Sequence, residues 1–187
     1  MIYILTGIAK SGKSLVANRL IQKYSLPTFS TDYIMMMLVR GNKTLGIDPD
    51  GEDEIVANQL RPYINGLIQT MVENKVDYFI EGVHFNPDFA RELLDKYPND
   101  IKVLYLGYKD VHVEDKINEL ERFKESNDNP WYKNFTKEEM NTLIEYMIKE
   151  SERVYQSCLL LNIDYLEISN IMLQIDSIEQ YFFKSSN

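Results

Sequence analysis

The segment TGIAKSGKS, residues 6–14, follows an apolar run directly and carries residue types that can bind phosphate. Four residues separate Gly7 from Gly12-Lys13-Ser14, which is the spacing of a phosphate-binding loop. The glycines of such a loop let backbone N–H groups face a β-phosphate at the positive end of the following helix. Lys13 then reaches the β- and γ-oxygens, and the Ser14 hydroxyl coordinates Mg²⁺. The predicted nucleotide-binding residues here are Gly7, Ala9, Lys10, Ser11, Gly12, Lys13 and Ser14.

Two acidic residues stand at the ends of apolar segments with strand chemistry. Asp32 ends FSTD, where a carboxylate can accept a proton from an acceptor hydroxyl or hold a water bound to Mg²⁺. Asp32 could also cap the helix that follows, and the two roles are compatible. Glu81 ends FIE, and a buried carboxylate there needs a partner that Mg²⁺ or its water shell would supply. His84 follows closely and is either a substrate contact or a hydrogen-bonded structural residue.

Basic residues near irregular segments are candidates for binding anions. Arg122 and Lys124 lie in ELERFKES, and an arginine that arrives on closure of such a segment would stabilise a transferring phosphoryl group. The alternative is a solvated helix face. Arg40 and Arg61 flank another irregular segment and could bind an anionic acceptor by bidentate contacts, although surface placement fits equally well.

The composition limits the partners of the chain. Its 187 residues carry 29 acidic and 20 basic side chains, and the net charge of −9 gives no diffuse attraction to nucleic acid or to an anionic membrane. The single cysteine cannot form an internal disulfide, and no secretion signal is evident, so we expect a cytoplasmic protein. No apolar run reaches the roughly 18 residues that span a bilayer. The oligomeric state is left open.

Short apolar runs alternate with segments of helical spacing, which indicates strands buried on both faces of a parallel sheet. Thr136 and Glu139 form a capping box that begins a long helix at about 137–161. No linker divides the chain, so we expect one domain over residues 1–187. The segments 39–53 and 124–134 are irregular, and each is either a substrate loop or lid or a surface connector. The five predicted strands are 2–6, 27–31, 77–81, 102–108 and 163–169.

In the order GIAKSGKS, FSTDYIMMMLVRG, FIEGVHFNP, ERFKES and YLEISN, the chain resembles the small phosphate-loop kinases. That group includes shikimate, gluconate and nucleoside monophosphate kinases, and the chain looks most similar to the 2-phosphoglycerate kinase family. The resemblance implies the three-layer P-loop NTPase fold, an α/β architecture with a five-stranded parallel sheet of order 2-3-1-4-5. It also implies a substrate-binding segment at about 32–62, a lid at about 116–136, and the use of ATP with Mg²⁺.

From these residues we expect an ATP-dependent kinase that phosphorylates a hydroxyl group on a small, anionic metabolite similar to 2-phosphoglycerate. Lys13, Asp32 and Arg122 would be catalytic, with Arg122 also contacting ATP. The irregular segments leave other acceptors open. A regulatory protein that binds ATP without phosphotransfer and a toxin-like kinase of an activated sugar are the alternatives. The expected metal ligands are Ser14 and Glu81, and the expected acceptor contacts are Asp32, Arg40, Arg61, Glu81 and His84.

Overall fold

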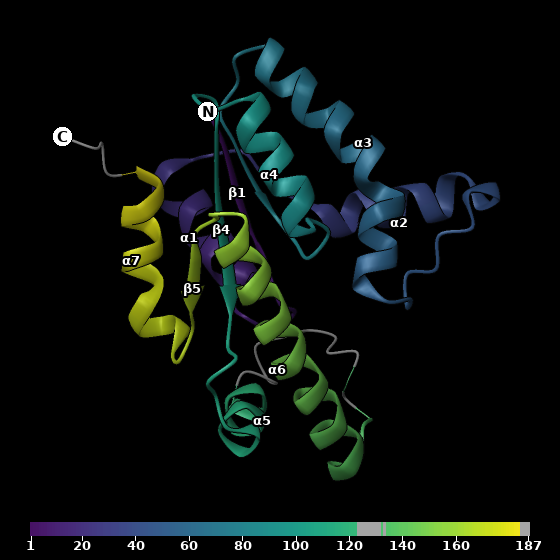
Figure 1. Ribbon diagram of the computed structural model, residues 1–187, viewed down its shortest axis with the longest axis vertical. Helices are drawn as coiled ribbons and strands as arrows, with labels where there is room; N and C mark the ends of the chain where they lie inside the picture. Colours follow the sequence, from purple (N-terminus) through teal and green to yellow (C-terminus); the bar gives the residue numbers. More distant parts are fainter. Residues whose placement is uncertain (123–131, 133, 184–187) are drawn as a thin grey trace.

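The computed structural model describes residues 1–122, 132 and 134–183. Five parallel strands form one sheet in the order β2-β3-β1-β4-β5, which confirms the predicted fold class and strand order (Figure 1). All five predicted strand segments contain a strand of the sheet. The strands are β1 (Ile2–Gly7), β2 (Thr28–Ser30), β3 (Tyr78–Glu81), β4 (Ile101–Gly107) and β5 (Tyr165–Glu167).

Helices cover both faces of the sheet, as Figure 1 shows. α1 and α7 pack on one face, while α3, α4 and α6 pack on the other. Within the described residues, none of the helices combines the length and apolar character that a bilayer crossing requires. The helices are α1 (Lys13–Tyr24), α2 (Thr31–Gly41), the 3₁₀ helix η1 (Lys43–Leu45), α3 (Asp53–Glu73), α4 (Pro87–Lys96), α5 (Val113–Arg122), α6 (Lys137–Leu160) and α7 (Ile171–Phe183).

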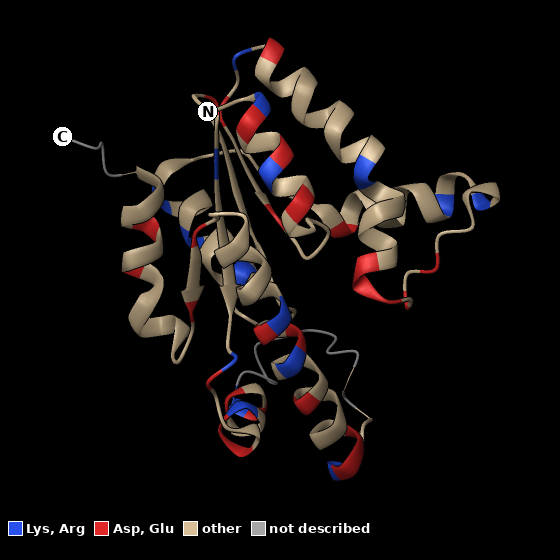
Figure 2. Ribbon diagram, viewed as in Figure 1, with Lys and Arg blue, Asp and Glu red and all other residues tan. Residues whose placement is uncertain are grey.

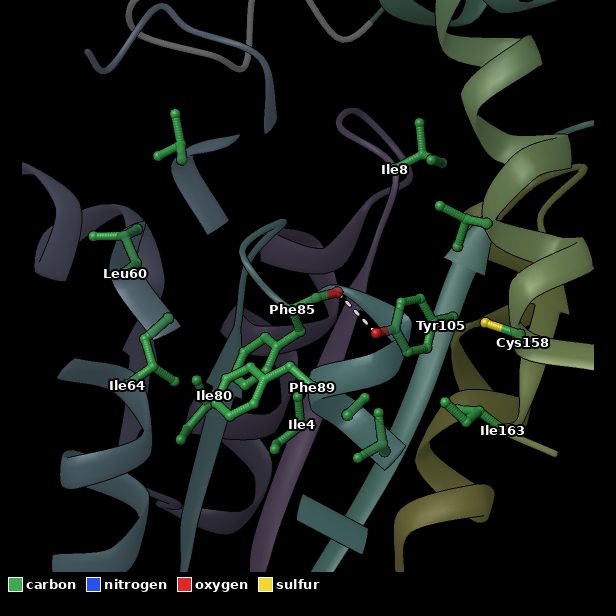
Figure 3. Close-up of a cluster of buried hydrophobic side chains, with 14 of the residues drawn as sticks. Ile4, Ile8, Leu60, Ile64, Ile80, Phe85, Phe89, Tyr105, Cys158 and Ile163 are labelled. Atoms are coloured by element: carbon green, nitrogen blue, oxygen red, sulfur yellow. Dashed lines mark hydrogen bonds between the residues drawn. The ribbon is translucent and has the colours of Figure 1, made fainter. Parts of the chain in front are cut away.

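The strands are apolar on both faces because each face is covered by helices. Successive side chains of a strand point to opposite faces, so Ile4 joins the core under α3, α4 and α6 while Leu5 joins the core under α1 and α7. Figure 3 shows the first of these cores, in which the Tyr105 hydroxyl donates a hydrogen bond of 2.8 Å to the Phe85 carbonyl. That bond satisfies the one polar atom of the Tyr105 side chain, which is almost fully buried.

The register of the sheet brings the candidate site residues to one edge. Glu81 at the end of β3 pairs with Leu5 of β1 and with Ser30 of β2, and Gly7 pairs with Leu106 of β4. The phosphate loop, the start of α2 and the end of β3 therefore leave the sheet side by side. In parallel α/β sheets this carboxyl edge is where ligands bind.

Local sequence signals explain where two of the helices begin. The Thr136 side chain accepts from the Glu139 N–H and the Glu139 side chain accepts from the Thr136 N–H, which confirms the predicted capping box of α6. At α2, the Ser30 hydroxyl accepts from the Asp32 N–H. The alternative that Asp32 caps this helix is therefore wrong, because Ser30 is the N-cap and Asp32 lies in the first turn.

The structure describes one of the two segments predicted to be irregular, 39–53, and little of the other, 124–134. α2 continues through Gly41, and η1 follows it, so the non-helical part of segment 39–53 is shorter than the sequence predicts. The substrate-binding segment expected at 32–62 comprises α2, η1 and the first half of α3. The expected lid includes α5 up to Arg122, whereas Lys124 and most of segment 124–134 lie outside the described residues.

Candidate active site

The phosphate loop holds its own lysine through backbone carbonyls. The Lys13 ammonium, which is 6% exposed, donates to the carbonyls of Ile8 at 2.7 Å and Gly7 at 3.2 Å. Burial lowers the pKa of Lys13 to about 8, although the nearby charges of Glu81 and Asp32 favour the protonated form. The loop carbonyls occupy the donors that a phosphate would use, so Lys13 is poised to exchange one set of oxygens for another.

Two glycines shape the loop in a way that no other residue can. Gly7 has φ of +112° and Gly12 has φ of +92°, a region that L-residues rarely adopt. A Cβ on Gly7 would lie 2.1 Å from the Leu106 carbonyl oxygen, and one on Gly12 would lie 2.5 Å from the Ile171 side chain. The loop is therefore wedged between β4 and α7, which fixes its backbone against both elements.

Two side chains, one just after β4 and one in α5, hold the loop carbonyls in place. The Tyr108 hydroxyl donates to the Ala9 carbonyl at 2.7 Å, and the Lys116 ammonium donates to the Lys10 carbonyl at 2.9 Å. Lys116 is almost fully buried, pairs with Glu119 at 2.7 Å, and lies over the Tyr108 ring at 4.2 Å. The helix α5, at the base of the expected lid, is thus bonded directly to the phosphate loop.

Ser14 and Glu81 provide the oxygen atoms that Mg²⁺ prefers. The Ser14 hydroxyl donates to Glu81 Oε2 across 3.4 Å, and the Glu81 carboxylate is 8% exposed. A buried carboxylate with one long hydrogen bond is incompletely satisfied, and a hard cation next to it would complete its interactions. The residues present therefore fit the expected metal, with Ser14 and Glu81 as the groups that would hold it directly or through water.

Asp32 lies beside a buried histidine. Asp32 Oδ1 is 3.8 Å from His84 Nδ1, and the same nitrogen is 2.8 Å from the Thr31 hydroxyl. Burial lowers the pKa of His84, against the opposing charge of Asp32, so the ring is neutral at neutral pH and the contact with Asp32 is not an ion pair. The Asp32 side chain is 64% exposed and faces a pocket of about 1100 Å³.

The pocket joins most of the predicted residues and adds others. Lys10, Lys13, Ser14, Asp32, Glu81 and His84 line it together with residues of α2, α3 and α6. Asp53, the first residue of α3, also lines it. Burial raises the pKa of Asp53, Lys13 opposes this shift, and Asp32 adds to it.

The predicted arginines lie elsewhere. Arg61 pairs with Asp88 and Glu92 of α4 and stacks over the Phe89 ring at 5.0 Å, so its guanidinium bridges α3 and α4 rather than lining the pocket. Arg40, in the last turn of α2, and Arg122, in the last turn of α5, are exposed and are not pocket residues. The placement of Arg61 disagrees with its predicted acceptor contact, because acidic side chains of α4 already occupy it.

Three residues of the candidate site were not identified from the sequence. Asp53 lies in the acidic run GEDE, but acidic residues commonly begin helices because of the helix dipole, so the signal was ambiguous. Lys116 lies in a helix of alternating charges, which is typical of a solvated face. Thr31 stands beside Asp32 in FSTD, and its contact with His84 depends on the pairing of distant segments.

No family model matches the sequence, and no curated relative matches it. Solved structures do match over nearly the whole chain. A shikimate kinase from Bacteroides thetaiotaomicron is 18% identical, has a TM-score of 0.59, and matches 99% of each chain. A shikimate kinase from Acinetobacter baumannii in complex with shikimate is 15% identical with a TM-score of 0.57, covering 99% of this chain and 94% of that one. A gluconokinase from Sinorhizobium meliloti is 11% identical with a TM-score of 0.56, covering 98% and 96%.

These likenesses confirm that the chain has the fold of the small phosphate-loop kinases. They hold over the full sheet and both helical layers, in agreement with the strand order described above. The expected closeness to 2-phosphoglycerate kinases stays a prediction, since these three structures are shikimate kinases and a gluconokinase.

Proposed function

We propose that the protein is an ATP-dependent kinase that transfers the γ-phosphoryl group of ATP to a hydroxyl group of a small metabolite. The observation that carries the proposal is the shared pocket onto which the phosphate loop and the Asp32 carboxylate both open. A phosphate site alone would suit many functions, but a carboxylate facing the same cavity places a proton acceptor where a second substrate can bind.

In the proposed reaction, Lys13 releases the Gly7 and Ile8 carbonyls and binds phosphate oxygens instead. It then offsets the negative charge on the transferring group. Mg²⁺ bound near Ser14 and Glu81 would supply further neutralisation of phosphate charge. The acceptor oxygen forms a new O–P bond while the bond from the γ-phosphorus to the β–γ bridging oxygen breaks, and the hydroxyl proton passes to Asp32.

The remaining predicted residues have supporting roles in the proposal. His84 is neutral and buried next to Asp32, so it can hydrogen-bond the acceptor without competing as a cation. Arg122 would have to approach the phosphates through movement of α5 and the following segment. Arg40 has no described contact with the pocket that supports acceptor binding.

The test is transfer of label from γ-labelled ATP to a pool of small acids, sugars, amines, nucleosides and nucleotide sugars, with products identified by mass. We expect one labelled product that depends on Mg²⁺ and is lost in Lys13→Met. Tight ATP binding without any labelled product would overturn the proposal and favour a regulatory ATP-binding protein. Label on a nucleotide sugar alone would favour the toxin-like kinase.

A further inference from the structure

The pocket is lined by more acidic than basic side chains, and four of the acidic ones, Asp32, Asp50, Glu52 and Asp53, come from α2, α3 and the segment that precedes α3. Among the described residues that line it, Lys10 and Lys13 are the basic ones and there is no arginine. Both lysines belong to the loop: Lys13 bonds the loop carbonyls, and the Lys10 ammonium lies 5.0 Å from the centre of the Tyr132 ring. The acidic lining residues are Asp32, Asp50, Glu52, Asp53, Glu81 and Glu119.

Two arginines of the helices that flank this pocket are engaged in other contacts. Arg61 pairs with two carboxylates of α4, and Arg153 of α6 pairs with Glu54 and Glu150. Figure 2 shows the same pattern: the start of α3 is acidic, whereas α2 carries its one basic residue, Arg40, in its last turn. An anionic acceptor would therefore meet carboxylates on α2 and α3 without an arginine to pair with among the described lining residues.

A positively charged group on the acceptor would fit the carboxylates on the α2–α3 side of the pocket well. Asp32 and Asp53 lie in the first turns of neighbouring helices and line the pocket together, and the charge of Asp32 contributes to the raised pKa of Asp53. The ring of Tyr146, from α6, lines the same space, as do Met35, Met36 and Val56. A carboxylate beside an aromatic ring and methionine side chains is a setting that binds ammonium groups, through charge pairing and through the ring face.

We propose that the phosphate acceptor carries a protonated amine in addition to its hydroxyl group, as an amino alcohol, amino sugar or aminocyclitol does. The inference rests on the proposed kinase function and names its substrate class. Asp53, with the ring of Tyr146, binds the ammonium, which orients the hydroxyl toward Asp32. The amine is bound and does not react: the hydroxyl oxygen gains the phosphoryl group, the bond to ADP breaks, and the hydroxyl proton goes to Asp32.

The test compares acceptors that differ only in charge. Amino sugars and aminocyclitols are assayed for ATP-dependent phosphorylation beside their N-acetylated forms, together with shikimate, gluconate and 2-phosphoglycerate. We expect phosphorylation of an amine-bearing acceptor, with kcat/KM about tenfold above that of its N-acetylated form, because acetylation removes the positive charge that the Asp53 carboxylate attracts. The anionic acceptors should give no acceptor-dependent product.

A substitution separates binding of the amine from a general effect on the pocket. Asp53→Asn should reduce the preference for the amine over its N-acetylated form to about threefold or less, with little change for the N-acetylated form itself. Glu54→Gln is the matched control, because the neighbouring carboxylate pairs with Arg153 and does not line this pocket. It should leave the preference unchanged.

The outcomes distinguish this inference from the proposed function. Phosphorylation of an anionic acceptor, or equal phosphorylation of charged and N-acetylated forms, would overturn the amine inference and leave the kinase function standing. Transfer to no acceptor at all, while ATP still binds, would overturn both. Should Asp53→Asn fail to fold, the matched acceptor pairs with the unmodified protein still decide the question.

Discussion

The two ends of the pocket are built differently. At the phosphate loop, glycine positions are wedged against β4 and α7, and Tyr108 and Lys116 bond the loop carbonyls. On the α2–α3 side, the wall consists of exposed carboxylates and methionines, and Asp32 is more than half exposed. Among the described residues, hydrogen bonds from Tyr108 and Lys116 thus fix the loop end, whereas Asp32 on the other side is open to the pocket.

The difference between the two ends corresponds to two binding tasks: the loop end is suited to phosphate, and the α2–α3 side is suited to the acceptor. A phosphate has a fixed shape and charge, so a preformed backbone cradle binds it with little rearrangement. The α2–α3 wall, here called the acceptor wall, gathers several carboxylates around one space, and a ligand with positive charge would relieve their mutual repulsion. Under the proposed function, the loop end would carry the chemistry that phosphate-loop kinases share, and the acceptor wall would carry the substrate specificity.

The largest expected effect comes from filling the cradle of the loop. Gly12→Ala would place a methyl group 2.5 Å from Ile171 in a backbone region unfavourable to alanine. We expect ATP affinity to fall by at least about a hundredfold, measured by calorimetric titration. Gly66→Ala is the control: this residue lies within α3, no atom lies within 4 Å of the added Cβ, and the change should stabilise the protein by about 0.5–1 kcal/mol. Equal ATP affinity in the two variants would contradict a wedged loop.

A smaller effect is expected from the support that α5 gives the loop. Lys116→Met keeps the apolar stem but removes the bond to the Lys10 carbonyl. The KM for ATP should rise about threefold to tenfold, with kcat changed less, because the lost bond supports the loop rather than ATP itself and only part of its contribution of about 1.5–3 kcal/mol reaches the ligand. Lys96→Met, at an exposed position in the last turn of α4, should change neither constant. A fall in kcat with KM unchanged would instead place Lys116 in the chemical step.

The loop lysine makes ATP binding depend on pH. Phosphate needs the protonated amine, and burial lowers the pKa of Lys13 to about 8 in the free protein. ATP affinity should therefore be nearly constant between about pH 7 and 8 and then weaken toward about tenfold per pH unit above it. Lys13→Arg should remove this dependence, because arginine stays protonated throughout the range. A wild-type affinity that is constant up to pH 9.5 would show that Lys13 titrates higher.

The smallest effect is expected at a residue that the sequence pattern placed in the acceptor site. Arg61→Ala removes exposed ion pairs between α3 and α4, so unfolding free energy should fall by about 1 kcal/mol or less. Phosphorylation kinetics should stay within about twofold of the unmodified protein. A selective rise in the KM for the acceptor would show that Arg61 contacts the acceptor after all. It would also contradict the view that the α2–α3 side of the pocket lacks a basic side chain.

The sequence predicted the loop end well because its information is local. Gly7, Gly12, Lys13 and Ser14 stand in one short segment whose spacing is tied to one backbone shape. Glu81 was identified because strand ends of a parallel sheet meet at one edge, and the register brings it to Ser14 across 3.4 Å. The strand order was implied by the resemblance and is confirmed by the sheet.

The acceptor wall was less predictable because its residues come together only through packing. Arg61 was expected to bind an anion, but its partners on α4 are 27 and 31 residues away. In the sequence, Asp53 looks like an ordinary acidic residue at the start of a helix. Its place in the pocket follows only from the packing of α3 beside α2. Arg122 precedes residues outside the described part of the chain, so its role stays a prediction.

The central claim is that Asp32 receives the proton when the phosphoryl group moves, and single-turnover transfer measures this directly. With Mg²⁺, ATP and the acceptor identified by mass, we expect Asp32→Asn to slow transfer by about a hundredfold or more while ATP affinity changes less than about threefold. The matched change Asp50→Asn, also in the pocket wall, should slow transfer far less. Transfer at the unmodified rate in Asp32→Asn would contradict the account.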